Sequence, residues 1–453
     1  MVFSSITFLY YFLPILLIVY YLIPKKFRNI VLLIFSLTFY FYGEKNIILL
    51  LMCGFNYFFG KIIGKTKTKT SLAIGVICNI LVLGYYKYCN FFIENINSLF
   101  QVDIPYFDII LPLGISFFTF QNISYLIDVY KQDVLPQKNL LNYATYITLF
   151  PQLIAGPIIR YKDINYELEN RKETFNQFSK GVSKFLVGLA KKVMIANQIG
   201  QMCVVLNAMP EKTVVSHILE AIGYTLQIYF DFSGYSDMAI GLGLFFGFNF
   251  KENFNYPLIA NSITDFWRRW HISLSSFFRD YIYIPLGGNR VPFGKWIRNI
   301  LVVWLLTGLW HGTSWNFILW GGYFFIFLLI EKLFLKKFLK NNILSHLYTL
   351  IVIVISFVIF NITNLNDMFV FFKSMLGLNG LNFINHTTYY YLKNYIILLV
   401  IAGIAATPLL KNIINKNKKL FASLEPIYFI GILLICTAML LSNSFNPFIY
   451  FRF

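Results

Sequence analysis

The stretch LVVWLLTGLWHGTSWNFILWGG, residues 301–322, decides the class of fold. It contains no Asp, Glu, Lys or Arg, and it belongs to an apolar segment that we place at 300–331. A helix that crosses a membrane needs about 20 predominantly apolar residues. The stretch meets that length, and it therefore predicts helical structure inside a membrane.

Comparable apolar segments recur on both sides of this stretch, from Phe3 almost to Phe453. The pattern predicts an all-α integral membrane protein with about 10–12 membrane segments, some of them too short or too broken to cross alone. We expect these segments near residues 3–23, 29–42, 46–63, 71–90, 108–127, 139–158, 215–230, 234–250, 300–331, 343–363, 393–410 and 426–443.

The composition excludes a soluble globular enzyme. Of the 453 residues, 58% are hydrophobic and only 13% are charged, against about 25% charged in a typical soluble domain. No stretch of soluble composition is long enough for a separate domain. We therefore predict one membrane domain over residues 1–453, with N-terminal spans at 1–130, a central core at 139–330 that includes a cytoplasmic interfacial segment at 160–192, and C-terminal spans at 343–453.

The net charge of +18 comes from 38 Lys and Arg against 20 Asp and Glu. In a soluble protein such an excess would suggest nucleic acid as a partner, whereas in a membrane protein it marks cytoplasmic loops. The basic clusters Lys25–Arg28 and Lys61–Lys69 therefore predict cytoplasmic loops, an outside N-terminus and an extracellular loop from Glu94 to Asp108. We expect no nucleic-acid partner. Further cytoplasmic loops are expected at residues 336–340 and 411–419, with Phe453 outside.

Up to Arg160 the predicted loops alternate between the two sides of the membrane, but at Arg160 this alternation breaks down. A full crossing by residues 139–158 would place the basic stretch 160–192 outside, against the positive-inside rule. The sequence PQLIAGPIIRY, residues 151–161, offers a solution, because two prolines and a glycine break the helix and let the segment re-enter and return on the same side. For residues 160–192 we predict an interfacial helix, since apolar residues recur there at helical spacing among lysines.

Ionisable residues inside apolar segments are costly, and they mark functional candidates. The first candidate is His311, which lies about eleven residues into the charge-free run, near the depth of a bilayer midplane. A neutral imidazole there suits a general base in a buried cavity; the alternative is a ring that only bridges two helices. Gly308, Gly312, Gly321 and Gly322 would let a neighbouring helix or a ligand approach closely.

The second candidate is the block NSITDFWRRWHISLSSFFRDYIYIPLGGNR, residues 261–290. Its charged residues alternate with large aromatic residues, which predicts a buried re-entrant segment lining a hydrated path rather than a surface loop. Asp265 and Arg269 fall at positions i and i+4 of a helix, so their charges can neutralise each other. In such a segment His271 could face His311.

Two further places hold polar candidates. Asp231 and Asp237 lie in the apolar stretch QIYFDFSGYSDMAIG, residues 227–241, where they could pair with the arginines of the 261–290 block or take part in catalysis. Arg160, beside the break at Gly156 and Pro157, could shape a cavity or contact an anionic donor molecule. The alternative for this last place is a simple helix break.

Several familiar sites are missing from the sequence. There is no H-E-x-x-H zinc motif, no G-x-x-x-x-G-K-S/T phosphate loop and no G-x-S-x-G nucleophile elbow. The five cysteines form no C-x-x-C pair and the five histidines are dispersed. We therefore predict no metal site and no bound cofactor.

Five blocks of the sequence together resemble one family. They are LFPQLIAGPIIRY (149–161), QIYFDFSGYSDMAIGLGLFFGF (227–248), NFNYPL (253–258), SITDFWRRWHISLSSFFRDYIYIPLGGNR (262–290) and LTGLWHGTSWNFILWG (306–321). In order and wording they are similar to the membrane-bound O-acyltransferases, in particular to the bacterial alginate O-acetyltransferase branch. The resemblance extends over most of the chain.

The resemblance implies a fold of many helices, some of them re-entrant, around a central tunnel, with residues 139–330 as the catalytic core. The catalytic histidine of the family matches His311 in the WHG motif, and the second motif histidine matches His271. The candidate tunnel or donor contacts are Arg160, Arg268, Arg269, Trp310, Asp231 and Asp237.

The resemblance also implies a reaction and its partners. A thioester, either acetyl-CoA or an acyl carrier protein, would enter from the cytoplasm of a bacterium as the acyl donor. Its acyl group would pass through the tunnel in the cell membrane to a hydroxyl of a cell-surface polysaccharide, by way of a separate extracytoplasmic acyltransferase. A thioester is already activated, so the protein must supply a base, hydrogen-bond donors for the developing oxyanion and exclusion of water. His311 as the base, with His271 and nearby Arg or Trp donors as positioning groups, would meet these needs.

Two other functions stay open at this point. D-alanyl transfer from a carrier protein to teichoic acid belongs to the same family. A polysaccharide or lipid transporter belongs to a different class, in which the intramembrane charges would serve conduction. The transporter predicts substrate movement that survives His311→Ala, whereas the acyltransferase predicts that acylation is lost. The sequence names neither the acceptor polysaccharide nor the oligomeric state.

Overall fold

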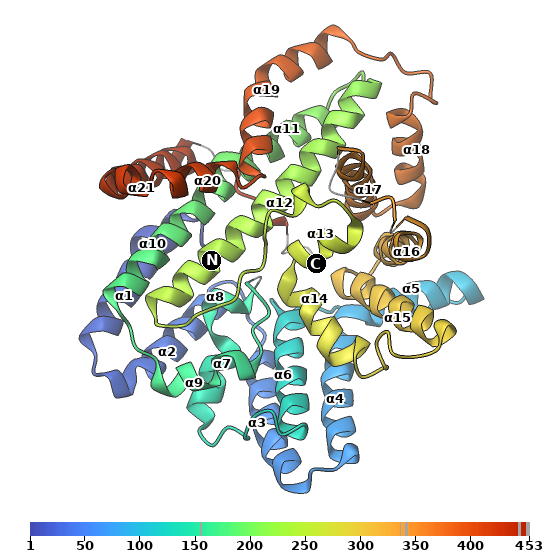
Figure 1. The fold of residues 1–453 in the computed structure, drawn as a ribbon. Helices are drawn as coiled ribbons and strands as arrows, with labels where there is room; N and C mark the ends of the chain where they lie inside the picture. Colours follow the sequence, from blue (N-terminus) through green and yellow to red (C-terminus); the bar gives the residue numbers. More distant parts are fainter. Residues whose placement is uncertain (155, 336, 340–342, 443–444, 450–453) are drawn as a thin grey trace. The chain divides into compact units, whose positions relative to one another are not determined.

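The computed structural model describes the chain except residues 155, 336, 340–342, 443–444 and 450–453 and the side chains of residues 418–422. All regular secondary structure within the described residues is helical (Figure 1), which confirms the predicted all-α class. Lys336, Lys340 and Phe453, whose sides of the membrane were predicted, lie outside the described residues. The chain forms two compact units, residues 1–185 with 238–251 and residues 186–237 with 252–453. The single domain over residues 1–453 stays a prediction.

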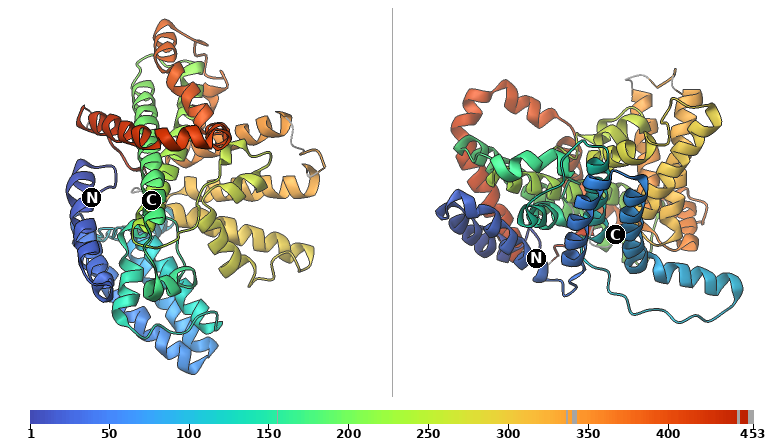
Figure 2. Two further views of the ribbon diagram at one scale, coloured as in Figure 1. Left: turned by 60° about the vertical axis from the view of Figure 1, so that its left-hand side comes forward. Right: turned by 90° about the horizontal axis from the view of Figure 1, so that it is seen from below.

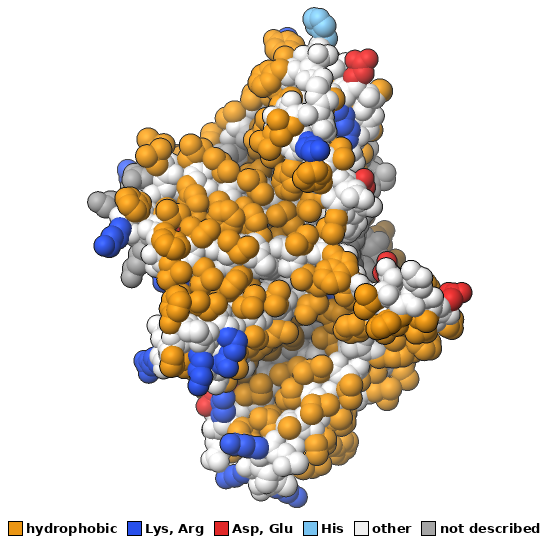
Figure 3. Space-filling view, turned by 90° about the vertical axis from the view of Figure 1, so that its right-hand side faces the viewer, with side chains coloured by type: hydrophobic (Ala, Val, Ile, Leu, Met, Phe, Trp, Pro, Cys, Tyr) orange, Lys and Arg blue, Asp and Glu red, His pale blue; other side chains and the backbone are white. Residues whose placement is uncertain are grey.

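Six helical stretches in the described part of the chain are long and apolar enough to cross a membrane. They are Ile48–Thr66, Lys69–Phe100, Trp315–Leu335, Ile343–Asn361, His386–Ala405 and Ser423–Ser442, and a shorter apolar stretch covers Phe8–Leu22. These helices expose large hydrophobic side chains, and Figure 3 shows a face on which hydrophobic side chains dominate while Lys and Arg gather at a few places. Apolar surface of this extent suits lipid rather than water, as expected for a multi-pass membrane protein.

The first unit contains most of the N-terminal helices. Its described elements are η1 (Phe8–Phe12), α1 (Leu13–Leu22), η2 (Lys25–Phe27), α2 (Arg28–Phe41), α3 (Ile48–Thr66), α4 (Lys69–Leu83), η3 (Gly84–Tyr88), α5 (Cys89–Phe100), α6 (Ile115–Tyr130), α7 (Leu140–Thr148), α8 (Phe150–Leu153) and α9 (Tyr161–Asn170). Helices α3 and α4 pack against each other and against α6. The buried amides of Asn56 and Asn79 exchange two hydrogen bonds, of 2.7 and 3.1 Å, between α3 and α4. This exchange removes the cost of burying unpaired amides.

The loop predicted from Glu94 to Asp108 begins later than expected, because α5 continues to Phe100. The chain after α5 runs back along that helix, as the right-hand view of Figure 2 shows. Asn90 and Asn97 of α5 hold it there through hydrogen bonds with the backbone of Phe107 and Ile104. The helix thus supplies the backbone partners that an isolated extended segment would lack.

The predicted helix break in PQLIAGPIIRY is confirmed. Helix α7 ends at Thr148, α8 covers only four residues from Phe150, and residues 156–160 are not helical. A Cβ atom on Gly156 would lie 2.6 Å from the carbonyl oxygen of Pro151, so the chain can fold back onto α8 only with a glycine there. The re-entrant path through a membrane stays a prediction. So does the interfacial position of residues 160–192, which are helical over α9 and α10 (Phe175–Ala190).

The second unit contains the C-terminal helices. Its described elements are η4 (Lys191–Ala196), α11 (Asn197–Asn207), η5 (Pro257–Ile259), α13 (Ile263–Arg269), α14 (Ile272–Phe278), η6 (Arg279–Tyr283), α15 (Phe293–His311), α16 (Trp315–Ile330), η7 (Glu331–Leu335), α17 (Ile343–Asn361), α18 (Leu365–Met375), α19 (His386–Ala405), α20 (Leu409–Lys416) and α21 (Lys418–Ser442). The bounds of α10 and of α12 (Val214–Phe245) include residues of both units.

The two segments predicted at 215–230 and 234–250 are wrong as separate helices, because residues 214–245 form the single helix α12 and residues 246–250 lie beyond its end. The polar residues Asp231, Ser233 and Asp237 lower the hydropathy of its middle, yet all of them are buried in the protein. Buried polar side chains interrupt an apolar pattern without interrupting the backbone hydrogen bonds of the helix. The hydropathy pattern therefore predicted two helices where the structure has one continuous helix.

The segment predicted at 300–331 is also two elements rather than one span. Helices α15 and α16 pack against each other and are joined by a turn that begins at Gly312. His311 is therefore the last residue of α15, and it does not lie in the middle of a continuous helix as its place in the apolar run suggested.

Candidate active site

The α15–α16 hairpin places His311 at its turn. A Cβ atom on Gly308 would collide with the carbonyl oxygen of Phe317, and one on Gly321 would collide with the carbonyl oxygen of Trp304. A Cβ atom on Gly312 would collide with the ring of Phe317. The three glycines thus allow the close helix approach that was predicted for them, while Gly322 has no heavy atom within 4 Å of such a Cβ position.

The imidazole of His311 is 3% exposed and lies among aromatic rings. The ring centroid of Trp320 is 5.0 Å away, that of Phe360 5.2 Å and that of the neighbouring Trp310 4.9 Å, all in edge-to-face arrangements. Helices α15, α16 and α17 each contribute one of these rings. A histidine so enclosed is shielded from bulk water, which strengthens the electrostatic interactions of groups within the cluster.

His271 occupies the sharp turn between α13 and α14. Its φ of +44° lies in the left-handed region, which is unfavourable for a residue with a Cβ atom. Two hydrogen bonds hold the turn, because Ile272 N donates to the carbonyl oxygen of Asn253 at 3.0 Å and Ser273 N donates to Asn253 Oδ1 at 3.1 Å. Strained backbone that its surroundings enforce occurs often at functional sites.

Asn253 also fixes the imidazole of His271. Its Oδ1 accepts hydrogen bonds from Ser273 N and from Ser273 Oγ (2.9 Å), while its Nδ2 donates to Ser236 Oγ at 3.0 Å. The atom that faces His271 Nδ1 at 3.3 Å is therefore the acceptor Oδ1, so Nδ1 carries the proton and Nε2 carries the lone pair. Burial lowers the pKa of His271, which lies outside the six candidate spans, to about 3. The ring is thus neutral at physiological pH.

The structure brings the two predicted histidines into one aromatic cluster. Trp310 contacts both, with its ring centroid 5.9 Å from His271 and 4.9 Å from His311. His271 also meets the ring of Phe232 from α12 edge to face at 4.7 Å. Trp310, which the sequence nominated only through its place in the WHG motif, therefore contacts both histidines.

Two buried hydrogen-bond donors of this aromatic cluster were not among the residues named from the sequence. Trp267 and Trp320 are 8% and 2% exposed, and across the described residues neither indole Nε1 atom has a hydrogen-bond partner. Their ring centroids are 5.7 Å apart, and Trp320 also contacts His311. A buried donor without a partner costs about 1–3 kcal/mol, so an acceptor that enters this cluster would be stabilised.

The two aspartates of α12 form ion pairs with neighbouring lysines. Asp231 lies 2.6 Å from Lys192, with both side chains 3% exposed, and Asp231 Oδ2 also accepts a hydrogen bond from Ile449 N at 2.9 Å. Asp237 lies 2.6 Å from Lys191. The prediction that arginines of the 261–290 block would be the partner is wrong for Asp231. The lysines come instead from η4, because it packs close to the middle of α12.

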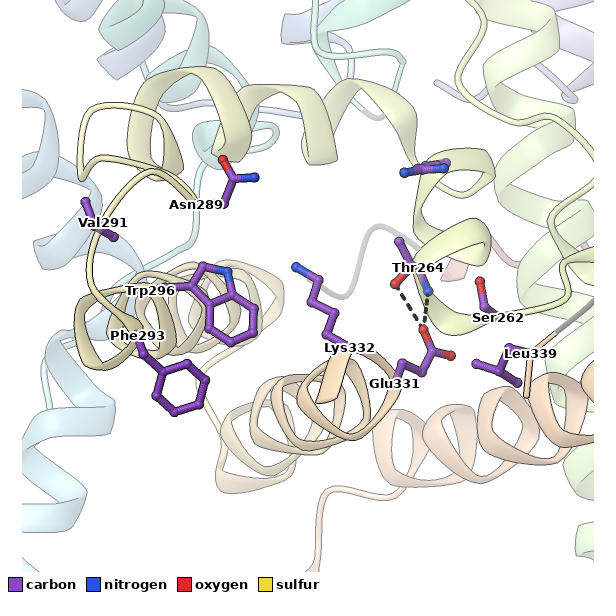
Figure 4. A pocket seen from close by; sticks show the side chains of 10 residues that line it. Ser262, Thr264, Asn289, Val291, Phe293, Trp296, Glu331, Lys332 and Leu339 are labelled. Atoms are coloured by element: carbon purple, nitrogen blue, oxygen red, sulfur yellow. Dashed lines mark hydrogen bonds between the residues drawn. The ribbon is translucent and has the colours of Figure 1, made fainter. Parts of the chain in front are cut away.

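The predicted i, i+4 pair is confirmed, since Arg269 Nε lies 2.9 Å from Asp265 Oδ2. Arg268, one residue earlier, instead lines a pocket of about 810 Å³ at the other end of the α15–α16 hairpin. Neither histidine lines this pocket. Figure 4 shows Lys332 extending into it between Trp296 and Thr264. The role of Arg268 and Arg269 as donor contacts stays a prediction.

Arg160 belongs to the first unit. Its side chain is 7% exposed, and its backbone precedes α9 in an extended conformation. The carbonyl oxygen of the preceding residue, Ile159, accepts a hydrogen bond of 2.9 Å from the Tyr146 hydroxyl. Arg160 is therefore held in a well-packed turn after the break, and its contact with a donor molecule stays a prediction.

Comparison with known proteins gives this arrangement its context. The chain is 45% identical to a probable alginate O-acetylase of Azotobacter vinelandii over 73% of its own length and 69% of that protein. It is 35% identical to a peptidoglycan O-acetyltransferase of Helicobacter pylori over 84% of its own length and 81% of that protein. It is 30% identical to a teichoic acid D-alanyltransferase of Bacillus subtilis over 56% of its own length and 67% of that protein. Residues 135–372, which include both histidines, match the MBOAT family, and the chain is accordingly a member of the membrane-bound O-acyltransferase family.

Proposed function

We propose that this O-acyltransferase moves an acetyl group from a cytoplasmic thioester through the membrane to a hydroxyl of an extracytoplasmic cell-surface polysaccharide. The observation that carries the proposal is the enclosure of His311 and His271 around Trp310 in a buried aromatic cluster. The alginate O-acetylase and the peptidoglycan O-acetyltransferase align with a larger share of the chain than the teichoic acid D-alanyltransferase does, and at higher identity. These matches favour acetyl over D-alanyl as the group transferred.

His311 acts in this proposal as the general base. Whichever hydroxyl receives the acetyl group first gives its proton to the imidazole as its oxygen attacks the thioester carbonyl carbon. The carbon–sulfur bond then breaks, and the leaving thiolate takes the proton back from His311. The product is an oxygen ester and a free thiol, so that no electron acceptor or further reactant is needed.

The indoles of Trp267 and Trp320 supply hydrogen-bond donors for the negative charge that develops on the carbonyl oxygen. Both Nε1 atoms are buried, and within the described residues both lack a hydrogen-bond partner. Donors of this kind act most strongly on charge that appears in the transition state in a site without water. His271 does not take the proton in this scheme. Its neutral ring, fixed by Asn253, instead positions Trp310 beside the base.

The test is made in a bacterium that depends on this protein for surface acetylation. We expect His311→Ala to abolish ester-linked acetate on the surface polysaccharide while the protein still inserts into the membrane. The control is His386→Ala, which changes an exposed histidine at the start of α19. The proposal fails if acetate on the polysaccharide persists in the His311 variant. D-alanyl esters in place of acetate would favour the D-alanyltransferase alternative, and polysaccharide export that requires the chain without acylation would favour the transporter.

The acyl donor and a partner acyltransferase on the outer side belong to the same proposal. Acetyl-CoA and an acyl carrier protein both present the acetyl group as a thioester, and the site chemistry above suits either. Purified membranes supplied with each labelled donor distinguish them, since only the true donor transfers label to the polysaccharide.

A further inference from the structure

Another pocket, of about 530 Å³, lies within the second unit, and we call it the His217 pocket. Its walls come from the loop between α11 and α12, from the first turn of α12, from the end of α17, from α18 and from the segment that follows α18. The lining residues that decide its chemistry are Lys212, His217, Ile362, Asp367, Phe371 and Asn379. Pockets that bind small ligands commonly have volumes of about 300–1,000 Å³, so this one has the size of a binding site.

Hydrogen bonds hold the walls of the His217 pocket together. The chain that joins α18 to α19 passes the start of α12 (Figure 1), where Val214 N donates to the carbonyl oxygen of Asn382 at 3.1 Å. This bond satisfies one of the first N–H groups of α12, which have no partner inside the helix. The hydroxyls of Thr213 and Thr388 also share a hydrogen bond of 2.9 Å. The pocket is therefore built on segments that are tied to one another.

His217 presents a hydrogen-bond acceptor to this pocket. The residue is 6% exposed, and its ring meets that of Phe371 edge to face with centroids 5.0 Å apart. Its Nδ1 atom lies 2.8 Å from the carbonyl oxygen of Thr213. Because a carbonyl oxygen only accepts, Nδ1 carries a proton, and in the neutral ring Nε2 carries the lone pair. Within the described residues Nε2 has no hydrogen-bond partner, so it is available to a ligand in the pocket that the ring lines.

Two further acceptors line the same pocket. Asn379 Nδ2 donates to the carbonyl oxygen of Val370 at 3.2 Å and to Ser374 Oγ at 2.8 Å. Both of its hydrogens are thus used, and Oδ1 is left to accept. Asp367, in the first turn of α18, forms no ion pair in the described part of the chain. Its carboxylate therefore also remains open to a donor from outside.

This set of groups fits a sugar. A sugar ring carries several hydroxyls, each of which donates one hydrogen bond, and the pocket offers three kinds of acceptor together with the ammonium group of Lys212 as a donor. The side chains of Phe371 and Ile362 add apolar surface for the C–H groups of the ring. A pocket with a few placed polar groups on an apolar wall is typical of small-ligand sites. Acceptors outnumber the single cation of the lining, which disfavours a free anion such as phosphate.

The His217 pocket and the histidine cluster adjoin the same end of α17. Ile362 lines the pocket, while Phe360, two residues earlier, contacts His311 with ring centroids 5.2 Å apart. The loops predicted to be cytoplasmic, at 336–340 and 411–419, belong to the opposite ends of α17 and α19. The predicted orientation therefore directs this pocket to the outer side, where the acceptor polysaccharide is expected.

We propose that the His217 pocket binds a sugar unit of the acceptor polysaccharide and keeps the polysaccharide beside the site of acyl transfer. The inference rests on the proposed function and adds a binding site for its acceptor. It holds whether the acetyl group reaches the polysaccharide directly or by way of an outer acyltransferase. His217 and Asp367 bind the sugar in this proposal, and neither takes part in the chemical step.

The experiment measures binding of short oligosaccharides to the full-length protein in nanodiscs. The oligosaccharides are prepared by partial hydrolysis of the de-O-acetylated surface polysaccharide of the same bacterium. We expect the wild type to bind them, and Asp367→Ala and His217→Phe each to weaken binding by about three- to tenfold, because each removes one hydrogen-bond acceptor. His217→Phe keeps an aromatic ring against Phe371. The control is Glu211→Ala, which removes an exposed carboxylate next to Lys212 that does not line the pocket and should bind like the wild type.

A kinetic measurement separates binding from chemistry. In acetyl transfer, Asp367→Ala and His217→Phe should raise KM for the polysaccharide by a similar factor and leave kcat nearly unchanged. His311→Ala should lose transfer and still bind the oligosaccharides like the wild type. Loss of the base and loss of the sugar site are therefore measured separately, and failure of one does not imply failure of the other.

Two results would overturn the proposal. One is a wild-type protein that does not bind the oligosaccharides. The other is oligosaccharide binding that Asp367→Ala and His217→Phe leave unchanged, or that Glu211→Ala weakens as much as they do. If the two pocket variants instead lose only their association with the outer acyltransferase, the pocket belongs to a protein partner and the sugar site is wrong.

Discussion

The imidazole of His311 meets the indole of Trp320 edge to face, with ring centroids 5.0 Å apart and planes at 82°. The two residues belong to different arms of the α15–α16 hairpin, so the contact exists only because Gly308 and Gly321 let those arms approach closely. The same indole carries a buried Nε1 donor that lacks a partner in the described part of the chain. The proposed base and a candidate oxyanion donor are thus held together by one packing interaction.

Removing the donor while keeping the ring tests this role. Trp320→Phe should lower kcat by about a hundredfold or more with little change in KM, because the hydrogen bond forms only in the transition state. Steady-state acetyl transfer by the purified variant gives both constants. Trp315→Phe, in which the exposed indole at the start of the same helix is changed, should behave like the wild type. An unaltered kcat for Trp320→Phe would remove this indole from the mechanism.

The glycines of the hairpin should be sensitive to a single methyl group. Gly308→Ala and Gly321→Ala each place a Cβ atom against a backbone carbonyl of the facing helix, which cannot move without separating the helices. We expect each to lower the free energy of unfolding by about 1–3 kcal/mol and to reduce activity. Gly322→Ala is the matched control, since a Cβ atom there meets no heavy atom within 4 Å. Thermal unfolding in detergent ranks the three variants, and equal melting temperatures would contradict the packing described.

Asn253 is a positioning residue, and its effect should appear in the pH profile. Asn253→Asp keeps an oxygen near His271 Nδ1 but adds a negative charge, which favours the imidazolium form. The pKa of His271, about 3 in the wild type because of burial, should rise. His271 would then become protonated at a higher pH, so the acidic limb of the kcat profile should move to higher pH. A loss of activity that is uniform at all pH values would instead indicate a purely structural role.

The buried ion pair of Lys192 and Asp231 should stabilise the fold without taking part in transfer. Lys192→Met leaves the Asp231 charge buried and should destabilise the protein by about 3–5 kcal/mol. The double variant Lys192→Met with Asp231→Leu removes both charges and should recover most of the lost stability and of the activity. Protein abundance in membranes and a melting curve measure the recovery. Recovered stability without recovered activity would assign Asp231 a direct part in the reaction.

The helical membrane class, which the structure confirms, and the choice of both histidines as candidates follow from local features of the sequence. An ionisable residue within an apolar segment is conspicuous, and His311 is the only one between residues 301 and 322. The i, i+4 pair of Asp265 and Arg269 and the break after α8 likewise follow from local spacing and from prolines. Each of these predictions depends on residues that are near one another in the chain.

The features that escaped prediction depend on distant contacts. Asn253 gives no local sign that it will anchor His271, and the indoles of Trp267 and Trp320 look like ordinary apolar residues until the packed structure shows their unpartnered Nε1 atoms. The sequence predicted Lys192 as part of a basic interfacial segment, whereas its side chain is buried in an ion pair with Asp231. The hydrophobic pattern of residues 300–331 also gave no sign of the turn at Gly312, because the helices on both sides of the turn are apolar.

The most direct test uses the purified protein in sealed proteoliposomes, with labelled acetyl thioester on one side and the polysaccharide, together with its outer acyltransferase, on the other. We expect labelled ester on the polysaccharide with the wild type and none with His311→Ala, although the variant should reconstitute and melt like the wild type. Transfer by His311→Ala at the rate of the wild type would contradict the assignment of His311 as the base.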